Sequence, residues 1–307
     1  MQVTAKSRRA ARVQNYLFVI LLLIAVGLLA WLSTRFNYQA DWTAGGRRSL
    51  SETLNGALVY THSNRGGTDY LTTVLNNGTT GMNLVAPLHL ADRERDLWRL
   101  TLDWAPIESL SFQFAADDAQ DDYSGRSYGL RSGDMQNYSI DAGYTFSEAW
   151  QASAWVSHND TLARQTSCEQ ATAVGCPNSA ADPIWAANLR SVGNAAGIGL
   201  RSKPTTWLEF GVDLQQTRDH AEYRIDAVMP TGVTAPPDSQ YRQTRLKLHA
   251  LYALNKNTGA RVDYAYERWE IDDWTWTNWT YSDGTRVLQE PVQKVHFIGV
   301  SGYYRWW

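Results

Sequence analysis

The sequence has few of the features that mark an enzyme, a nucleic-acid-binding protein or a bundle of membrane helices. Only two of its 307 residues are cysteine, and no C-x-x-C-H haem attachment, G-x-S-x-G elbow or phosphate-binding glycine loop occurs. The net charge is −3, and no block of Lys and Arg lies beyond the first dozen residues. The mean hydropathy of −0.40 excludes a helical membrane bundle. We predict no catalytic residue, no cofactor, no metal site and no nucleic-acid partner.

Aromatic residues, in contrast, are abundant, with 14 Trp and 16 Tyr in a chain that is 44% hydrophobic and 19% charged. Membrane β-barrels combine these features, because only alternate residues of each strand face lipid and aromatic side chains gather at the two membrane borders. The composition therefore fits a membrane barrel better than an average soluble enzyme.

One long apolar run stands near the start of the chain. Residues Tyr16 to Leu32 carry no charge and follow a basic flank, and no convincing cleavage site ends the run. We interpret residues 1–36 as a basic flank and an uncleaved membrane helix with a cytoplasmic N-terminus. Residues 37–54 are expected to be a linker, and residues 55–307 a barrel domain.

From Asn55 onward, apolar and polar residues alternate. In Leu97 to Trp104, the side chains of Trp98, Leu100, Leu102 and Trp104 share one face, while Arg99, Thr101 and Asp103 share the other. The same pattern recurs in hairpins with short turns, which alternate with long polar loops. We predict about ten antiparallel strands in an up-and-down membrane barrel, with the turns in the periplasm and the loops outside. A soluble β-sandwich would also alternate, but the regular change of connection length favours the barrel.

The last strand, Val295 to Trp307, ends the chain in aromatic residues. Its Ile298, Val300, Gly302, Tyr304 and Trp306 lie on one face, with smaller and polar residues opposite. This segment resembles the closing strand of outer-membrane barrels, whose aromatic end is the signal read by the barrel-assembly machinery. The resemblance implies that Tyr304 together with Trp306 or Trp307 forms this signal.

Charged residues recur on the second face of the strands. They are expected to face a wet lumen, because a charge in the lipid midplane costs about 2 to 4 kcal/mol. The acidic stretch Asp117 to Gly133 is predicted to be a solvated loop, with Ca²⁺ binding as the less favoured reading. Cys168 and Cys176 are eight positions apart in a polar loop and could form a disulfide in an oxidising compartment. The predicted lumen-facing residues are Arg99, Asp103, Asp141, Glu209, Asp213, Lys247, Asp263 and Arg305.

Two resemblances to known families follow from longer segments. Residues 36–51, together with the apolar run, resemble the N-terminal anchor of GldG-type auxiliary subunits of ABC transporters, which implies an inner-membrane accessory protein as one alternative. The barrel segment resembles the MtrB/PioB family of decahaem-associated outer-membrane proteins. This second likeness rests on the hairpins at 102–111 and 200–209, the turn at 254–258, the strand at 264–269 and the end at 299–306.

The MtrB/PioB resemblance implies a non-enzymatic sheath in the bacterial outer membrane, which holds a periplasmic multihaem c-type cytochrome for electron transfer. Family members have more strands, so this chain is expected to be either part of a larger barrel or a simple pore. An uncleaved helix would hold the chain in the inner membrane. The helix is therefore either removed after export or fused from an unrelated reading frame.

Overall fold

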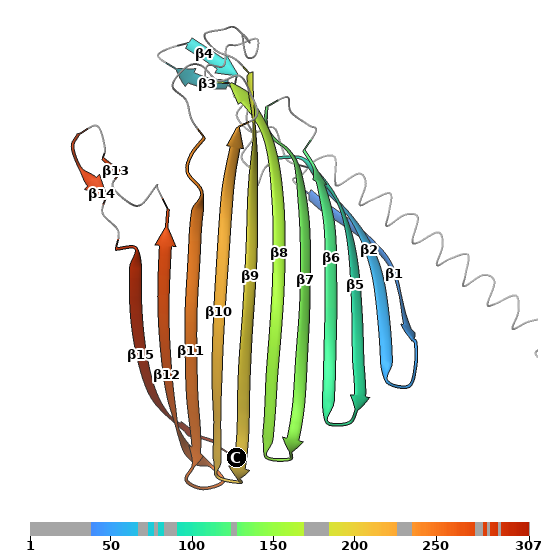
Figure 1. Cartoon of the computed structure of the whole chain (residues 1–307), viewed down its shortest axis with the longest axis vertical. Coiled ribbons are helices and arrows are strands. Elements are labelled where there is room, and N and C mark those ends of the chain that lie inside the picture. Colours follow the sequence, from blue (N-terminus) through green and yellow to red (C-terminus); the bar gives the residue numbers. More distant parts are fainter. Residues whose placement is uncertain are drawn as a thin grey trace, which may run out of the picture.

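The computed structural model shows one large antiparallel sheet (Figure 1). It describes residues 38–66, 73–76, 79–82, 91–123, 128–168, 184–225, 235–273, 279–280, 283–287 and 290–306. The strands of the large sheet are β1 (Tyr38–Ser49), β2 (Leu54–Gly66), β5 (Arg93–Ile107), β6 (Leu110–Asp122), β7 (Gly129–Ser147), β8 (Trp150–Cys168), β9 (Ile184–Thr205), β10 (Leu208–Ile225), β11 (Ser239–Ala253), β12 (Thr258–Asp272) and β15 (Val292–Tyr304). Two small ribbons, β3 (Thr73–Asn76) with β4 (Thr79–Met82) and β13 (Trp279–Thr280) with β14 (Arg286–Val287), belong to the loops.

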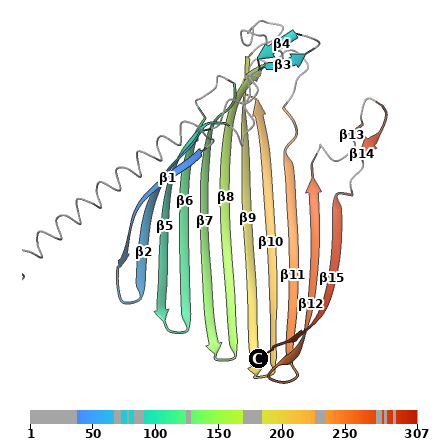
Figure 2. The same ribbon diagram turned by 180° about the vertical axis from the view of Figure 1, so that it is seen from behind.

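The topology is up and down throughout. The order in the sheet is β1-β2-β5-β6-β7-β8-β9-β10-β11-β12-β15, so each inner strand pairs with the strands before and after it in this order. This confirms the predicted all-β antiparallel fold. The large sheet has 11 strands where the alternation predicted about ten. β1 and β15 are its two edges and do not pair with each other, so the described sheet is an open, curved wall (Figures 1 and 2).

The extra strand is β1, which lies in the segment 37–54 that we expected to be a linker. Every residue of β1 pairs with β2, from Tyr38 opposite Gly66 to Ser49 opposite Asn55. Its even positions include Ala40, Ala44 and Gly46, which are too small to give a clear apolar period. Pairing with the more regular β2 selects the extended form, and the sequence of β1 alone does not reveal it.

The hairpin turns of the large sheet lie at one end of it, and the described end of the chain lies at the same end (Figure 1). The turns connect β1 to β2, β5 to β6, β7 to β8, β9 to β10 and β11 to β12. The expected hairpins are present, although the strands run further than their apolar stretches. For example, β9 continues through Pro204 to Thr205, so its turn lies beyond the predicted Lys203–Thr205.

The strands are staggered as in a barrel. A continuous row of cross-strand partners begins at Leu54, the first residue of β2, and ends at His296, eight residues before the end of β15 at Tyr304. With a rise of about 3.3 Å per residue and a strand spacing of about 4.8 Å, this shift inclines the strands by about 30°. The value is close to the tilt of 35–45° in membrane barrels.

Residues 1–37 lie outside the described part of the chain, and with them the predicted membrane helix. Within the described residues, none of the elements is a helix of the length and apolar character needed to span a bilayer.

Candidate functional site

The sheet has two chemically different faces, and the strand register keeps each face continuous. On one face, here called the apolar face, the row that begins at Leu54 brings large or small apolar side chains together on strand after strand. Many side chains of this face are exposed, including those of Ile140, Ile198 and Val300, at 47%, 61% and 75%. A water-soluble sheet would cover such a face. The row contains Leu54, Trp104, Phe112, Ala142, Ala154, Ile198, Leu214, Leu246 and Tyr266.

Aromatic side chains form a border along the turn end of the apolar face. Trp104 stacks on Phe112 with ring centroids 5.3 Å apart, and Trp150 meets Phe210 edge-on at 5.6 Å. Trp207 with Tyr252 and Tyr304 with Trp306 continue the line toward β15. This is where a membrane barrel places one of its two interfacial girdles.

A second aromatic border lies toward the loop end of the same face, and it contains histidine. Tyr60 lies between Trp42 and Trp98, and His62 packs against Trp42 with centroids 5.6 Å apart. On β12 and β15, Tyr266 packs against His296 at 4.9 Å. Amphipathic rings of this kind suit the region between lipid tails and water.

The distance between the borders matches a bilayer. On the apolar face of β11, Tyr252 marks the turn end and Arg242 is the first charged residue toward the loops. These ten residue steps at about 3.4 Å, inclined by about 30 to 40°, give a height of about 25 to 30 Å, and the apolar band of outer-membrane barrels is about 25 Å tall.

The opposite face, here called the polar face, carries the predicted lumen-facing residues. Strict alternation and pairing place the strand residues of that set on it, with Asp103 opposite Gln113, Gln113 opposite Asp141, and Asp213 opposite Lys247. Arg305 follows β15, and its guanidinium lies 5.5 Å from the ring centroid of Tyr303. Several charges of the polar face form ion pairs: Arg47–Asp103 at 3.3 Å, Arg99–Asp117 at 2.7 Å, Arg95–Asp121 at 2.5 Å, Arg201–Asp213 at 3.0 Å and Arg261–Asp263 at 2.8 Å.

Two bidentate pairs lie between β5 and β6. Nε and Nη2 of Arg99 donate to the two carboxylate oxygens of Asp117 at 2.7 and 2.9 Å, and Arg95 holds Asp121 in the same way. The carboxylate side chains are only 10% and 11% exposed. Nearly buried carboxylates need such partners, since an unpaired charge in that position is costly.

The acidic stretch after Phe114 is therefore not a loop, and the prediction of a solvated loop from Asp117 to Gly133 is wrong for most of its length. β6 continues to Asp122, and β7 begins at Gly129. Successive acids alternate between the faces, so they do not converge on a calcium site. Asp117 and Asp121 pair with arginines of β5 on the polar face, whereas Asp118 accepts a hydrogen bond from Gln136 on the other.

Tyr123 closes this polar cluster at the loop end, just beyond β6. It is 7% exposed, and its backbone N–H donates to the carbonyl of Arg131 at 2.9 Å. Burial raises the pKa of the Tyr123 phenol, and the nearby negative charge of Asp121 raises it further.

Glycines on the polar face make room for large neighbours. A Cβ on Gly197 would lie 2.5 Å from Nε1 of Trp155, so the indole of β8 lies directly over this glycine of β9. A Cβ on Gly199 would meet the side chains of Ser153 and Asp213 at 2.6 and 2.9 Å. Gly197 and Gly199 of β9 are therefore explained by packing along the polar face.

The remaining predicted residues are only partly described. Tyr304 and Trp306 lie at the turn end of the apolar face with centroids 4.7 Å apart, whereas Trp307 lies outside the described residues. Cys168 is the last residue of β8, and Cys176 also lies outside. The assembly signal and the disulfide therefore stay predictions.

Sequence reasoning missed a zone of charged residues beyond the apolar band, toward the loops. Here Arg190 forms a bidentate pair with Asp160, and Arg164 reaches Asp134. These charged residues lie on the apolar face, but nearer the loops than the apolar band. The strands that carry them extend beyond the length needed to cross the membrane. The lengths of β8 and β9, 19 and 22 residues, show this, since about 9 to 11 residues cross a bilayer.

The family model of the outer membrane beta-barrel porins MtrB/PioB matches residues 38–306. The chain belongs to this family. A curated relative, the outer membrane protein MtrB of Shewanella baltica (strain OS185), is 21% identical over 223 residues, which are 72% of this chain and 30% of the relative. The chain thus matches less than a third of the length of that relative. Membership confirms the outer-membrane location expected from the terminal strand.

Solved outer-membrane structures share the fold. The copper transporter OprC has a TM-score of 0.56 at 10% identity, covering 87% of this chain and 42% of OprC. BauA, the ferric preacinetobactin receptor of Acinetobacter baumannii, has a TM-score of 0.56 at 12% identity over 86% of this chain and 43% of its own. At these identities the likeness shows the fold only. In both cases the chain aligns with less than half of the larger protein.

Proposed function

We propose that the chain is a non-enzymatic part of the wall of an outer-membrane barrel, with its apolar face toward lipid and its polar face toward the lumen. The observation that carries this proposal is the contrast between the two faces. One exposes large apolar side chains between two aromatic borders, and the other pairs Arg99 with Asp117 and Arg201 with Asp213 in positions where lipid would penalise charge.

We further propose that the complete wall encloses a periplasmic multihaem c-type cytochrome, as the MtrB/PioB resemblance implies. The chain supplies no haem-attachment motif of its own. Barrel diameter grows with strand number, and about eight strands leave room only for side chains or one small ligand. Eleven strands closed on themselves would be too narrow for a cytochrome, so this role requires further strands between the edges β1 and β15.

A pore that lets small ions through is the second candidate function, and the mixed charges of the polar face favour it. Arginines and carboxylates alternate along this face, as in Arg261–Asp263 and Arg99–Asp117, and give it no single dominant sign. The two candidates share the orientation of the sheet and differ in what occupies the lumen.

The orientation can be tested with two adjacent residues of β7. Ile140 is on the apolar face and Asp141 on the polar face, with the same depth and neighbouring backbone positions. In a parent with Cys168→Ser and Cys176→Ser, a fluorophore at Asp141→Cys should be quenched by a water-soluble quencher. A fluorophore at Ile140→Cys should instead be quenched by a lipid-borne one. Equal quenching at both sites would contradict the proposal.

The partner can be tested by purification from the native outer membrane. We expect a haem-staining c-type cytochrome to co-purify with the chain and to disappear when the gene for that cytochrome is deleted. A purified protein that binds no haem protein but conducts small ions in planar bilayers would support the pore instead.

The barrel-assembly role of the chain end is tested separately, by replacing Tyr304 and Trp306 with Ala and measuring the amount of heat-modifiable protein in the outer membrane.

A further inference from the structure

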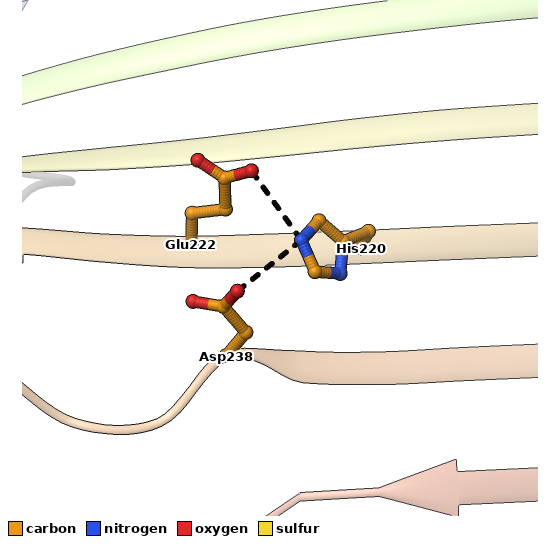
Figure 3. A group of neighbouring side chains, drawn as sticks. All are labelled: His220, Glu222 and Asp238. Carbon is orange, nitrogen blue, oxygen red and sulfur yellow. Dashed lines mark ion pairs between the residues drawn. The ribbon is translucent and has the colours of Figure 1, made fainter.

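Three potential metal ligands meet on the apolar side of β10, beyond the band that would contact lipid. His220 and Glu222 are two positions apart on β10, so their side chains point to the same face, and Asp238 lies just before β11 (Figure 3). One ligand atom from each residue lies within 4.8 Å of the other two, and within the described residues this is the one such group of three.

The spacing of the three groups suits a small divalent ion. Nε2 of His220 lies 3.4 Å from a carboxylate oxygen of Glu222 and 3.5 Å from one of Asp238. In a tetrahedral zinc site with ligand distances of about 2.0 to 2.2 Å, two ligand atoms are separated by about 3.4 Å. An ion placed between the three side chains would therefore reach all of them with little movement.

The surroundings hold two of the three ligands in place. Nη2 of Arg224 donates to the other oxygen of Glu222 at 2.9 Å, which leaves Oε1 directed toward His220. Such contacts from a neighbouring side chain orient metal ligands. Pro236 and Pro237 precede Asp238, and the fixed φ angles of proline limit the conformations available to that segment.

The site is accessible from water. The side chains of His220, Glu222 and Asp238 are 36%, 25% and 51% exposed. Cross-strand pairing places His220 opposite Val192 on β9 and Gln240 on β11, and neither of these two partners carries a charge. Arg190 lies opposite Glu222, but its guanidinium is held by Asp160 at 2.5 Å.

We propose that His220, Glu222 and Asp238 bind one divalent transition-metal ion of the zinc type, with water completing its coordination. One imidazole and two carboxylates form a donor set found in such sites. The ion would join β10 to the segment that leads into β11, and would fasten the ends of the connection between these two strands at the loop end of the sheet. The proposal does not depend on the contents of the lumen.

The test is Zn²⁺ binding to the full-length chain in detergent, measured by isothermal titration calorimetry and by the metal content after dialysis. We expect about one equivalent of bound Zn²⁺, with affinity reduced at least about tenfold in His220→Ala and in Asp238→Asn. Asp238 is exposed and outside the strands, so its variant should fold even if the change at His220 hinders assembly. X-ray absorption should show a first shell of N and O atoms at about 2.0 to 2.2 Å, without sulfur.

His158→Gln is the matched control. His158 is also a half-buried histidine on the same side of the sheet, but its ring pairs with Asn194 instead of two carboxylates. Its variant should bind Zn²⁺ as the parent does. The proposal is overturned if the parent retains no Zn²⁺, which would leave the cluster as contacts between side chains without a metal. Unchanged binding in both His220→Ala and Asp238→Asn would also overturn it.

Discussion

A single arginine on the apolar face should disturb the barrel far more than the loss of a charge on the polar face. Leu248 and Lys247 are adjacent on β11 and point to opposite faces. Leu248 lies between Val212 and Tyr264 in its row of cross-strand partners, four residues from the aromatic border at Tyr252. This places it near the middle of the apolar band, and its 37% exposure leaves the side chain open to lipid.

The expected magnitude follows from the depth of Leu248. An arginine on the lipid face at the bilayer midplane costs about 2 to 4 kcal/mol, which corresponds to about a 30- to 900-fold change in the folding equilibrium. Leu248→Arg should therefore lower the free energy of unfolding by that amount. Lys247→Ala should change it by about 0.5 kcal/mol or less, as is usual for a solvated position.

Equilibrium unfolding in urea, with the protein in lipid vesicles, gives the change in the free energy of unfolding for Leu248→Arg and for Lys247→Ala. Heat-modifiable migration on unboiled gels is the probe of the folded state. Leu248→Ala serves as the control for lost packing, and it should be much milder than Leu248→Arg because it adds no charge. The assignment of the two faces would be refuted if Leu248→Arg and Lys247→Ala had the same effect, or if the order were reversed.

Three further predictions concern the polar face and its loop end. Arg99→Ala should destabilise the barrel more than Asp117→Ala, because Asp117 is nearly buried and would be left unpaired, whereas Arg99 is half exposed; a double-mutant cycle in urea measures both, and equal effects would contradict the reasoning. Gly197→Ala should displace the indole ring that lies over it and shift the tryptophan emission, whereas Gly46→Ala, where an added Cβ meets nothing within 4 Å, should not. Because the folded-state pKa of Tyr123 is raised, its contribution to stability is complete below the unfolded pKa of about 10 and is lost as the pH rises through the folded value. Tyr123→Phe should therefore reduce the loss of stability seen in alkaline unfolding curves, and an unchanged curve would exclude this role.

Much of the sheet could be predicted from the sequence because a two-residue period has a direct physical meaning. In β5, the neighbouring residues Arg99 and Leu100 point to opposite faces of the sheet. Because one face is polar and the other apolar, the alternation of the sequence is enough to assign each residue to its face. The short turns predicted which consecutive strands form hairpins, and the aromatic end of β15 indicated the last strand of the sheet. Where neither signal is present, as in the small residues of β1, the strand is recognised only through its pairing with β2.

Other features depend on register, which no local pattern contains. Asp117 looks like part of an acidic loop until β6 is extended alongside β5, where Asp117 and Asp121 each lie opposite an arginine. In the same way, His220 and Asp238 are separated by 18 positions, and nothing in either segment predicts that they meet. Their proximity follows from the pairing of β10 with β11, in which His220 lies opposite Gln240.

The strictly sequential order of the strands has an evolutionary consequence. Within the described residues, each inner strand of the large sheet pairs with the strand before it and the strand after it in the sheet. A hairpin such as β7–β8 is therefore paired within itself and with one strand on either side, β6 and β9. Gaining or losing one hairpin changes the circumference without requiring new partners elsewhere, much as repeat proteins grow by adding units. Walls of different size can then descend from one another while the pairing rules, the aromatic borders and the alternation of faces stay the same.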